Sequence, residues 1–542
     1  MVLLPATLVA LVVAGPALVI ALSRWRARYA SGAVATLLAL LAVGWLAAGR
    51  RLPLAFTFSH WPAAASLPSW TWRVDNVAWQ LSVFVLLLAT AVVLAEVAGG
   101  GWQVWRKPAA CVTLLLPLTA ATLLALWADS LAAVLVSWAL LNGLWIGSLA
   151  LARTTSTSTG WGQQDKALIR LTIGLAGLLF VWLAAAALPD GGMAAGLGMS
   201  KWPSLAVAWL LVALVVQMGV FPLHVWRPYG WHLPTNLSAL FHLLPTIAGA
   251  SLLARLVASS DAPMAFSLPL TLVGLLSLLA GVGMAWSGTA RPERAVAALA
   301  VAQSSLILLA GVWAGPAAAL AETRVLALGV GALFLVTTGS RQPTADGGSP
   351  ASFRLSSFIL HPSSFITVAA LTGLPLTAGF LGRAALYEAW LADGRWLLVL
   401  TTALLHIPLV TAAYVVIRES KIENPRSKVQ LLALLLLALG LLSLPSGALI
   451  EQVSLITWLA VLVAAVGGVA LTRRMDALQS AQESWREAVR AILPFYPIFA
   501  WLRRAIVVIS LALRETARLL EGENGLLWLL ALLAIVWLAV RR

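Results

Sequence analysis

The chain has 542 residues, of which 61% are hydrophobic and only 10% are charged. Soluble domains carry about a quarter of charged residues, so this composition excludes an ordinary soluble domain and indicates a polytopic membrane protein. The single cysteine, Cys111, excludes disulfides within the chain, an iron-sulfur cluster held by cysteines and a zinc ribbon, and we expect no redox centre of its own.

Apolar runs of the length that crosses a bilayer, about 20 residues each, recur along nearly the whole sequence. We predict spans near 2–22, 32–49, 77–98, 109–128, 130–152, 166–188, 203–226, 235–257, 266–287, 293–313, 320–338, 365–391, 396–417, 429–447, 454–472 and 525–540. The expected fold is therefore all-α, a polytopic transmembrane helical bundle of about 14–16 spans.

The formal net charge of +15 comes from basic residues that lie between the apolar runs. A nucleic-acid-binding face needs Lys and Arg clustered on one folded surface, so no nucleic-acid partner is expected. Basic residues are more frequent in the loops after odd-numbered spans, beginning with Arg24, Arg26 and Arg28. By the positive-inside rule, we expect a multi-pass protein of the cell inner membrane with its N-terminus outside.

Three stretches depart from the pattern of simple spans. Residues 340–366 are polar and contain the motif SSFI twice, which indicates a loop insertion. Gly and Pro in residues 373–379 break a span, and we expect two interrupted helices in all. Residues 473–523 mix charged and apolar residues at helical spacing, which predicts an amphipathic lateral helix on the cytoplasmic surface, kinked at Pro494 and Pro497.

Polar side chains inside apolar spans are the candidate functional residues, because polarity at membrane depth is costly. His242 is the leading candidate for a proton carrier, since imidazole titrates near neutral pH; the alternative is a neutral histidine bonded to a neighbouring helix. Arg383 either holds an anion or caps carbonyls at the broken helix. Gln217 either orders water or is inert, and the inert interpretation is favoured.

Other polar residues have simpler explanations. We expect Arg170 and Lys166 to snorkel towards the membrane surface, and Arg73 to pair with Asp75 at a span mouth. The sequence has no nucleotide-binding glycine fingerprint, no metal-ligand cluster and no nucleophile with a paired base. We therefore expect no catalytic residue, no metal and no cofactor.

Two motifs carry a resemblance to a known family. The segment FPLHVWRPYGWHLPTNLSALFH at 221–242 and the segment GLPLTAGFLGR at 373–383 resemble the antiporter-like membrane subunits of respiratory complex I and of multi-subunit cation/proton antiporters. The largest of these subunits also ends in a lateral helix and a terminal anchor. The resemblance implies other membrane subunits and the lipid bilayer as partners, protons or Na⁺ as the transported ion, and a subunit of an NADH:quinone oxidoreductase-type complex.

The resemblance also implies a row of buried charges, most of which this chain lacks. His242 keeps the family's eighth-helix histidine, Arg383 stands for a twelfth-helix lysine, and Gln217 stands where the seventh span has a lysine. The remaining family positions have lost their charge, and fall at Ala139, Thr172, Leu175, Leu326 and Val330. Without the acid at Ala139 and the lysine at Gln217, the charge pair that shifts a pKa in the relatives is absent.

We divide the chain into N-terminal spans (1–108), a first antiporter-like bundle (109–263), a second (264–417), C-terminal spans (418–472), the lateral helix (473–523) and an anchor span (524–542). The expected function is that of a membrane subunit related to proton-translocating subunits, with a reduced path through His242, Arg383 and Gln217. The alternatives are a non-conducting structural subunit of the membrane arm and a membrane partner in inorganic-carbon uptake.

Overall fold

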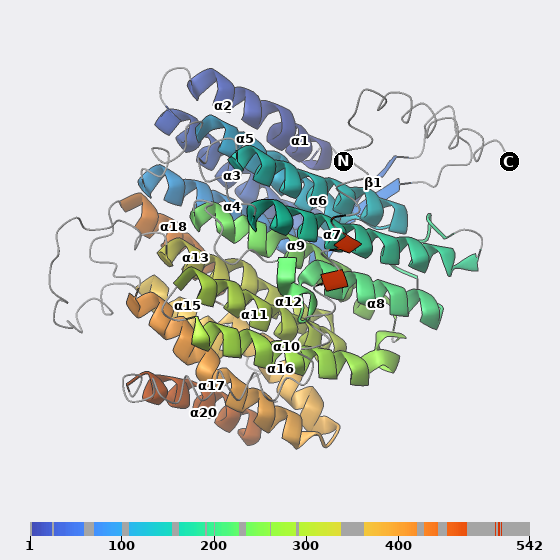
Figure 1. Ribbon diagram of the computed structural model, residues 1–542, viewed down its shortest axis with the longest axis vertical. Coiled ribbons are helices and arrows are strands. Elements are labelled where there is room, and N and C mark those ends of the chain that lie inside the picture. Colours follow the sequence, from blue (N-terminus) through green and yellow to red (C-terminus); the bar gives the residue numbers. More distant parts are fainter. Residues whose placement is uncertain are drawn as a thin grey trace.

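The computed structural model confirms an all-α, polytopic fold (Figure 1). It describes residues 3–23, 27–58, 70–99, 108–153, 162–189, 192–199, 201–226, 235–260, 262–288, 292–337, 362–419, 428–442 and 453–473, with single residues between 504 and 511. Among these residues, 10 helices are long and apolar enough to cross a membrane, and five apolar helices are shorter. The predicted lateral helix and anchor span, and most of the 340–366 insertion, lie outside the described residues.

The N-terminal half runs from α1 to α9. Its elements are α1 (Leu3–Val9), π-helical η1 (Ala10–Ala14), α2 (Gly15–Ser23), α3 (Ala27–Ala48), η2 (Gly49–Arg51), β1 (Leu54–Phe58), β2 (Trp70–Val74), α4 (Asn76–Gly99), α5 (Pro108–Trp127), α6 (Leu131–Arg153), α7 (Gly162–Ala186), α8 (Ser204–Met218), η5 (Leu223–Trp226) and α9 (Thr235–Ser259).

The C-terminal half continues through a second set of helices. They are η6 (Ala262–Phe266), α10 (Ser267–Ser287), α11 (Pro292–Ala314), α12 (Pro316–Arg324), π-helical η7 (Val325–Val330), α13 (Gly331–Thr337), α15 (Pro362–Thr372), α16 (Ala378–Ala392), α17 (Trp396–Glu419), α18 (Lys428–Leu441) and α20 (Leu455–Arg473). Because α12, η7 and α13 follow one another without a gap, they form one apolar span over Pro316–Thr337.

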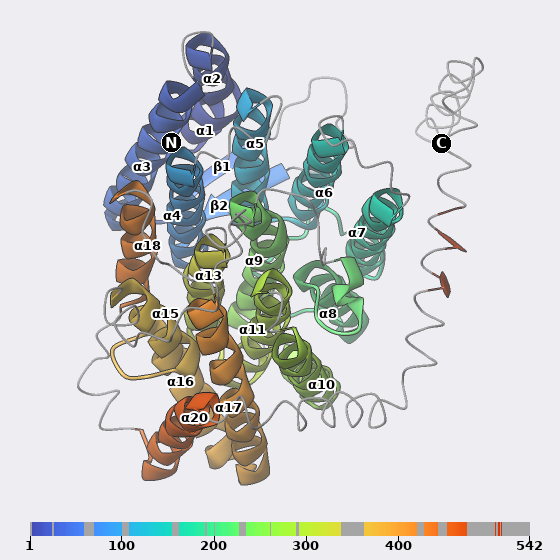
Figure 2. The ribbon, with the colours of Figure 1, turned by 60° about the vertical axis from the view of Figure 1, so that its left-hand side comes forward.

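The core lies along α9, α11 and the α12–η7–α13 span. The most apolar window of α11 is 100% buried, whereas that of α20 is 28% buried. Figure 2 shows α1, α2 and α3 near one end of the molecule and α17 with α20 at the other. These outer helices expose large apolar side chains, such as Leu40, Val43 and Leu459, as expected of surfaces that meet acyl chains or other membrane helices.

Two helices are interrupted, and glycine marks both interruptions. Gly219 ends α8 in the left-handed region at φ 63°, and the peptide bond from Phe221 to Pro222 is cis. The freed N–H of Phe221 donates to Ser277 Oγ on α10 at 3.0 Å. Between α15 and α16, Gly373 has φ 75°. A broken helix at membrane depth needs such internal partners, because lipid supplies none.

A short antiparallel hairpin of β1 and β2 was not predicted from the sequence. It pairs Leu54 with Val74 and Phe58 with Trp70. A strand pair of this length is marginally stable alone, so the hairpin depends on the helices that hold it.

Arg255, near the end of α9, holds this hairpin. Its guanidinium donates to the carbonyl of Ala128 at 2.6 Å and to that of Arg73 at 2.8 Å. It also lies 3.6 Å from Asp75 Oδ2 and 3.5 Å from Asp129 Oδ1. Asp75 therefore forms an ion pair with Arg255, whereas the sequence suggested a pair with Arg73. Burial raises the pKa of Asp129, while the nearby Arg255 opposes that rise.

Candidate functional site

Arg383 lies beside the break between α15 and α16, in the second turn of α16. Its side chain is 1% exposed, and its Nε lies 3.7 Å from Glu322 Oε1, whose side chain is also 1% exposed. Its Nη1 donates a weak hydrogen bond to the carbonyl of Ala370 at 3.4 Å. Both roles considered from the sequence are thus present: Arg383 faces a buried anion and also caps the broken helix.

Glu322 reaches this position from α12, and Gln303 of α11 fixes it. Gln303 Nε2 donates to Glu322 Oε2 at 2.5 Å and to the Glu322 backbone carbonyl at 3.1 Å. An amide that donates twice to one residue sets the orientation of the carboxylate. Three helices therefore converge on a single buried carboxyl group.

Two glycines of the segment GLPLTAGFLGR make room for this pair. A Cβ atom at Gly382 would lie 2.6 Å from Glu322 Oε1, and one at Gly373 would lie 2.9 Å from Arg383 Nη1. Only glycine admits such close approach, and Gly373 also has a positive φ that side chains disfavour. The motif recognised in the sequence therefore builds the space that the ion pair occupies.

The polar cluster continues one turn further along α16. Tyr387 OH lies 3.1 Å from His406 Nδ1 on α17, and the same nitrogen lies 2.8 Å from the carbonyl of Thr402. Tyr387 and His406 are both buried. We define the second-half cluster as Gln303, Glu322, Arg383, Tyr387 and His406.

The first half of the chain holds a separate set of buried polar groups. His242 of α9 is 3% exposed, and its ring stacks on Phe334 of α13 with centroids 5.1 Å apart. Gln217 of α8 is fully buried, and neither polar atom of its amide has a hydrogen-bond partner among the described residues.

Arg170 of α7 is also fully buried, so it does not snorkel as the sequence suggested. Its Nη2 donates to Asn142 Oδ1 of α6 at 2.7 Å, and its guanidinium lies 5.4 Å from the ring centroid of Trp145. The first half therefore keeps a buried cation that sequence reasoning placed at the membrane surface. The side chain of Lys166 lies outside the described part.

The family positions without charge differ in burial. Ala139 and Leu175 are on exposed faces of α6 and α7, while Thr172, Leu326 and Val330 are buried. Gln217 is buried on α8, whereas Ala139 is on an exposed face of α6.

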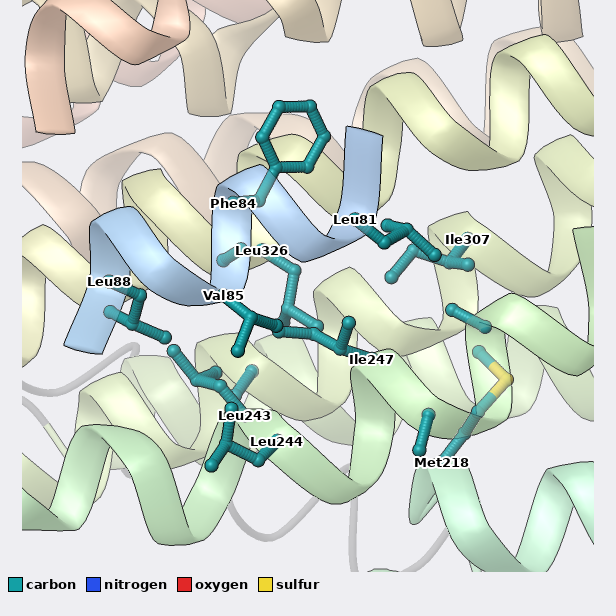
Figure 3. Packing of buried hydrophobic residues seen from close by; sticks show 14 of the residues in the cluster. Leu81, Phe84, Val85, Leu88, Met218, Leu243, Leu244, Ile247, Ile307 and Leu326 are labelled. Atoms are coloured by element: carbon teal, nitrogen blue, oxygen red, sulfur yellow. The ribbon is translucent and has the colours of Figure 1, made fainter. Parts of the chain in front are cut away.

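An apolar layer separates His242 from the second-half cluster. Along the α12–η7–α13 span, Leu326 and Val330 lie between Glu322 and Phe334. Figure 3 shows Leu326 among Val85 of α4 and Leu243 and Ile247 of α9.

Sequence reasoning missed Glu322 and His406. Each lies inside an apolar helix that qualifies as a membrane span, over Pro316–Thr337 and Trp396–Arg418 respectively. The signal that pointed to His242 was therefore present for both, because an ionisable residue inside a span indicates a functional site.

Comparison with known proteins finds a family that resembles the middle part of the chain. Residues 179–407 match the family described as NADH:quinone oxidoreductase/Mrp antiporter, TM. The chain is 27% identical over 222 residues to the NADH-quinone oxidoreductase subunit N of a Nocardioides species, covering 38% of this chain and 41% of that protein. It is 27% identical over 205 residues to subunit N of Thioalkalivibrio sulfidiphilus, covering 36% of this chain and 42% of that one. The chain thus spans about two fifths of the length of these relatives.

Two solved structures share the fold. One is the Mrp complex from Dietzia sp. DQ12-45-1b, with a TM-score of 0.69 and 17% identity over 99% of this chain and 62% of that chain. The other is the membrane-bound sulfane sulfur reductase, an archaeal respiratory membrane complex, with a TM-score of 0.66 and 16% identity over 99% of this chain and 100% of that chain. The comparisons therefore support an antiporter-like membrane protein: residues 179–407 match the NADH:quinone oxidoreductase/Mrp antiporter family, and the whole chain shares the fold of these two structures.

Proposed function

We propose that the chain is a membrane subunit of a complex I-like or antiporter-like assembly and takes part in moving protons or Na⁺ across the cell inner membrane. The observation that carries this proposal is the ion pair of Glu322 and Arg383, both 1% exposed. Burying two charges is expensive and gives little net stability, so a pair kept at membrane depth indicates a role in function.

The two members of the pair have different roles. Arg383 supplies the positive charge beside the carboxylate. Glu322 can exchange a proton, and its affinity for one depends on whether Arg383 is close. Gln303 holds the carboxylate in place through its two hydrogen bonds. Movement of Arg383 at the broken helix would therefore load or release a proton at Glu322.

His242 and Gln217 are the proposed polar groups of the path on the other side of the apolar layer. Gln217 supports this role because a buried amide without a protein partner is a binding place for water. The layer around Leu326 then acts as a hydrophobic gate, which stops ions when it is dry and passes them when water enters. We place the N-terminus outside, from the distribution of basic residues.

The test is proton or Na⁺ flux in proteoliposomes that contain the full chain with the membrane proteins that copurify with it. We expect Glu322→Gln to lower flux by about 10²–10⁴-fold, the range for loss of a proton-transfer group. The matched control is Glu388→Gln, because that carboxylate caps α20 through Ser454 and lies outside the second-half cluster. Unchanged flux in a folded Glu322→Gln protein would reject the proposal.

A second variant tests the first-half path separately. If His242 carries protons, His242→Ala lowers flux although the Glu322 pair is intact. Flux equal to that of the unmodified protein would remove His242 from the path.

A structural subunit that does not conduct is the second candidate function. The observation that favours it is the fully buried apolar layer of Leu326 and Val330, which interrupts the polar groups between His242 and Glu322. A scaffold predicts that no substitution in either polar cluster changes flux, while loss of the chain weakens the assembly.

A further inference from the structure

A stripe of buried polar side chains extends along α16 beyond the ion pair. Arg383, Tyr387 and Trp390 are spaced at i, i+4 and i+7 and therefore share one face of the helix. Thr402 and His406 share a face of α17 in the same way. All five side chains are buried, and the rings of Tyr387 and His406 meet edge to face with centroids 6.4 Å apart.

The hydrogen bonds of His406 fix which nitrogen carries the proton. Nδ1 lies 2.8 Å from the carbonyl oxygen of Thr402, which can only accept a hydrogen bond. Nδ1 must therefore be protonated, and the oxygen of Tyr387 at 3.1 Å is a second acceptor of the same N–H. It follows that Nε2 carries the lone pair. Nε2 is buried and has no hydrogen-bond partner in the described ranges.

Trp390 and Thr402 of the stripe each have a buried polar atom in the same condition. The indole Nε1 of Trp390 is a buried donor, and Oγ1 of Thr402 is a buried hydroxyl oxygen, and neither has a partner within the described part of the chain. Leaving such a group unsatisfied costs about 1–3 kcal/mol. Native proteins meet this cost with internal water that makes two to four hydrogen bonds, and each of these three atoms on the neighbouring helices α16 and α17 can bond to such water.

We propose that internal water binds between α16 and α17 at Trp390 Nε1, Thr402 Oγ1 and His406 Nε2, and that His406 is a further proton-accepting residue of the site. A proton delivered by this water binds the lone pair of Nε2 and gives an imidazolium with both nitrogens protonated. Its release to water restores the neutral ring. The water binding stands independently, whereas the transport role of His406 rests on the proposed function.

The charges around His406 come from few elements. Within the described residues, α16 contributes Arg383, Tyr387 and Glu388, and α12 contributes Glu322. The ionisable groups of α11 (Glu293, Arg294) and α20 (Arg473) are at helix ends, and α10, α13 and α15 have none. On α17 itself, Tyr414 and Arg418 lie two or more turns away. Of these charges, Arg383 acts most directly on His406, and its positive charge opposes an imidazolium there.

Radiolytic hydroxyl labelling of the full chain in lipid nanodiscs tests for bound water, because buried side chains react only where water is adjacent. We expect Trp390 to be labelled markedly faster than Trp127 and Trp45. These two controls are equally buried, but their indole N–H groups donate to Ser82 and Thr7. Labelling of Trp390 no faster than that of Trp127 overturns the water site.

Imidazole ¹⁵N NMR and flux test the role of His406. In histidine-labelled protein, the signal lost in His406→Gln should be that of an Nδ1–H tautomer, and an Nε2–H tautomer contradicts the proposal. His406→Gln should reduce flux about a hundredfold, as for a proton-transfer group. If Glu322→Gln abolishes flux but His406→Gln does not, this inference fails alone. If neither changes flux, the proposed function fails, and the labelling of Trp390 still decides the water site.

Discussion

At the scale of single residues, the second-half cluster depends on small side chains as much as on charged ones. Glu322 contacts the backbone of α16 at Gly382, where a Cβ atom would overlap its carboxylate. The ion pair exists because a glycine precedes the arginine in the chain. Two adjacent residues therefore build the site: Gly382 leaves space for the Glu322 carboxylate, and Arg383 supplies the opposite charge.

Gly382→Ala should displace the carboxylate of Glu322 and destabilise the folded chain by about 1–3 kcal/mol, the cost of overpacking. Flux should fall with it, because the distance between Glu322 and Arg383 changes. Gly143→Ala is the control, since nothing lies within 4 Å of its added Cβ, and it should be neutral or slightly stabilising. Thermal unfolding in nanodiscs measures both, and equal stability of the two variants would contradict the packing described.

The sequence predicted part of this site, because an ionisable residue inside an apolar span indicates a functional site. Arg383 and His242 were identified as ionisable groups in apolar spans, and both are buried. Glu322 was missed because it lies seven residues into α12 and two before Arg324, which resembles a polar helix end. The packing of α16 against α12 helps to bury it, and that contact joins segments far apart in the chain.

At the scale of elements, helices and their interruptions followed from apolar run length and from Gly and Pro, whereas the hairpin did not. β1 and β2 are five residues each and lie in a loop between spans, so no periodicity marked them. Their position depends on Arg255, which bonds β2, the end of α5 and the start of α4. Arg255 forms this clamp largely through backbone carbonyls, which every residue has, so the sequence pattern does not reveal it.

Arg255→Met should destabilise the protein by about 3–5 kcal/mol, because it leaves Asp75 and Asp129 without their buried partner. The exposed Arg50→Met is the matched control and should change stability by less than about 0.5 kcal/mol. Unfolding midpoints of the two variants check this. A loss no larger in Arg255→Met than in Arg50→Met would show that the clamp is not structural.

At the scale of the whole molecule, two sets of buried polar groups lie in one apolar bundle. The set with His242, Gln217 and Arg170 belongs to the first half, and the second-half cluster is separated from it by Leu326 and Val330. The sequence predicts that the first half lacks most of the family's charges, and Arg170 remains there as a buried cation. The charge pair that the second half keeps was not predicted, and it moves the expected centre of function to α12 and α16.

Leu326→Ser should raise ion flux, because a hydroxyl in the apolar layer lowers the cost of water there. The change also removes buried apolar volume and should lower stability by a few kcal/mol. Leu328→Ser is the control: Leu328 is on the same π-helical segment but packs towards Gly440 of α18. We expect Leu328→Ser to lose as much stability as Leu326→Ser but to leave ion flux unchanged. Increased flux in both variants would indicate general leakage and not a gate.

The most direct test of the central claim is a double-mutant cycle on ion flux with Glu322→Gln, Arg383→Gln and the combined variant, each confirmed as folded. Two residues that act as one unit give non-additive losses. We predict that the double variant conducts no less than the poorer single variant. Losses that multiply, or flux unchanged in all three proteins, would contradict the claim that this buried pair is where ions are transferred.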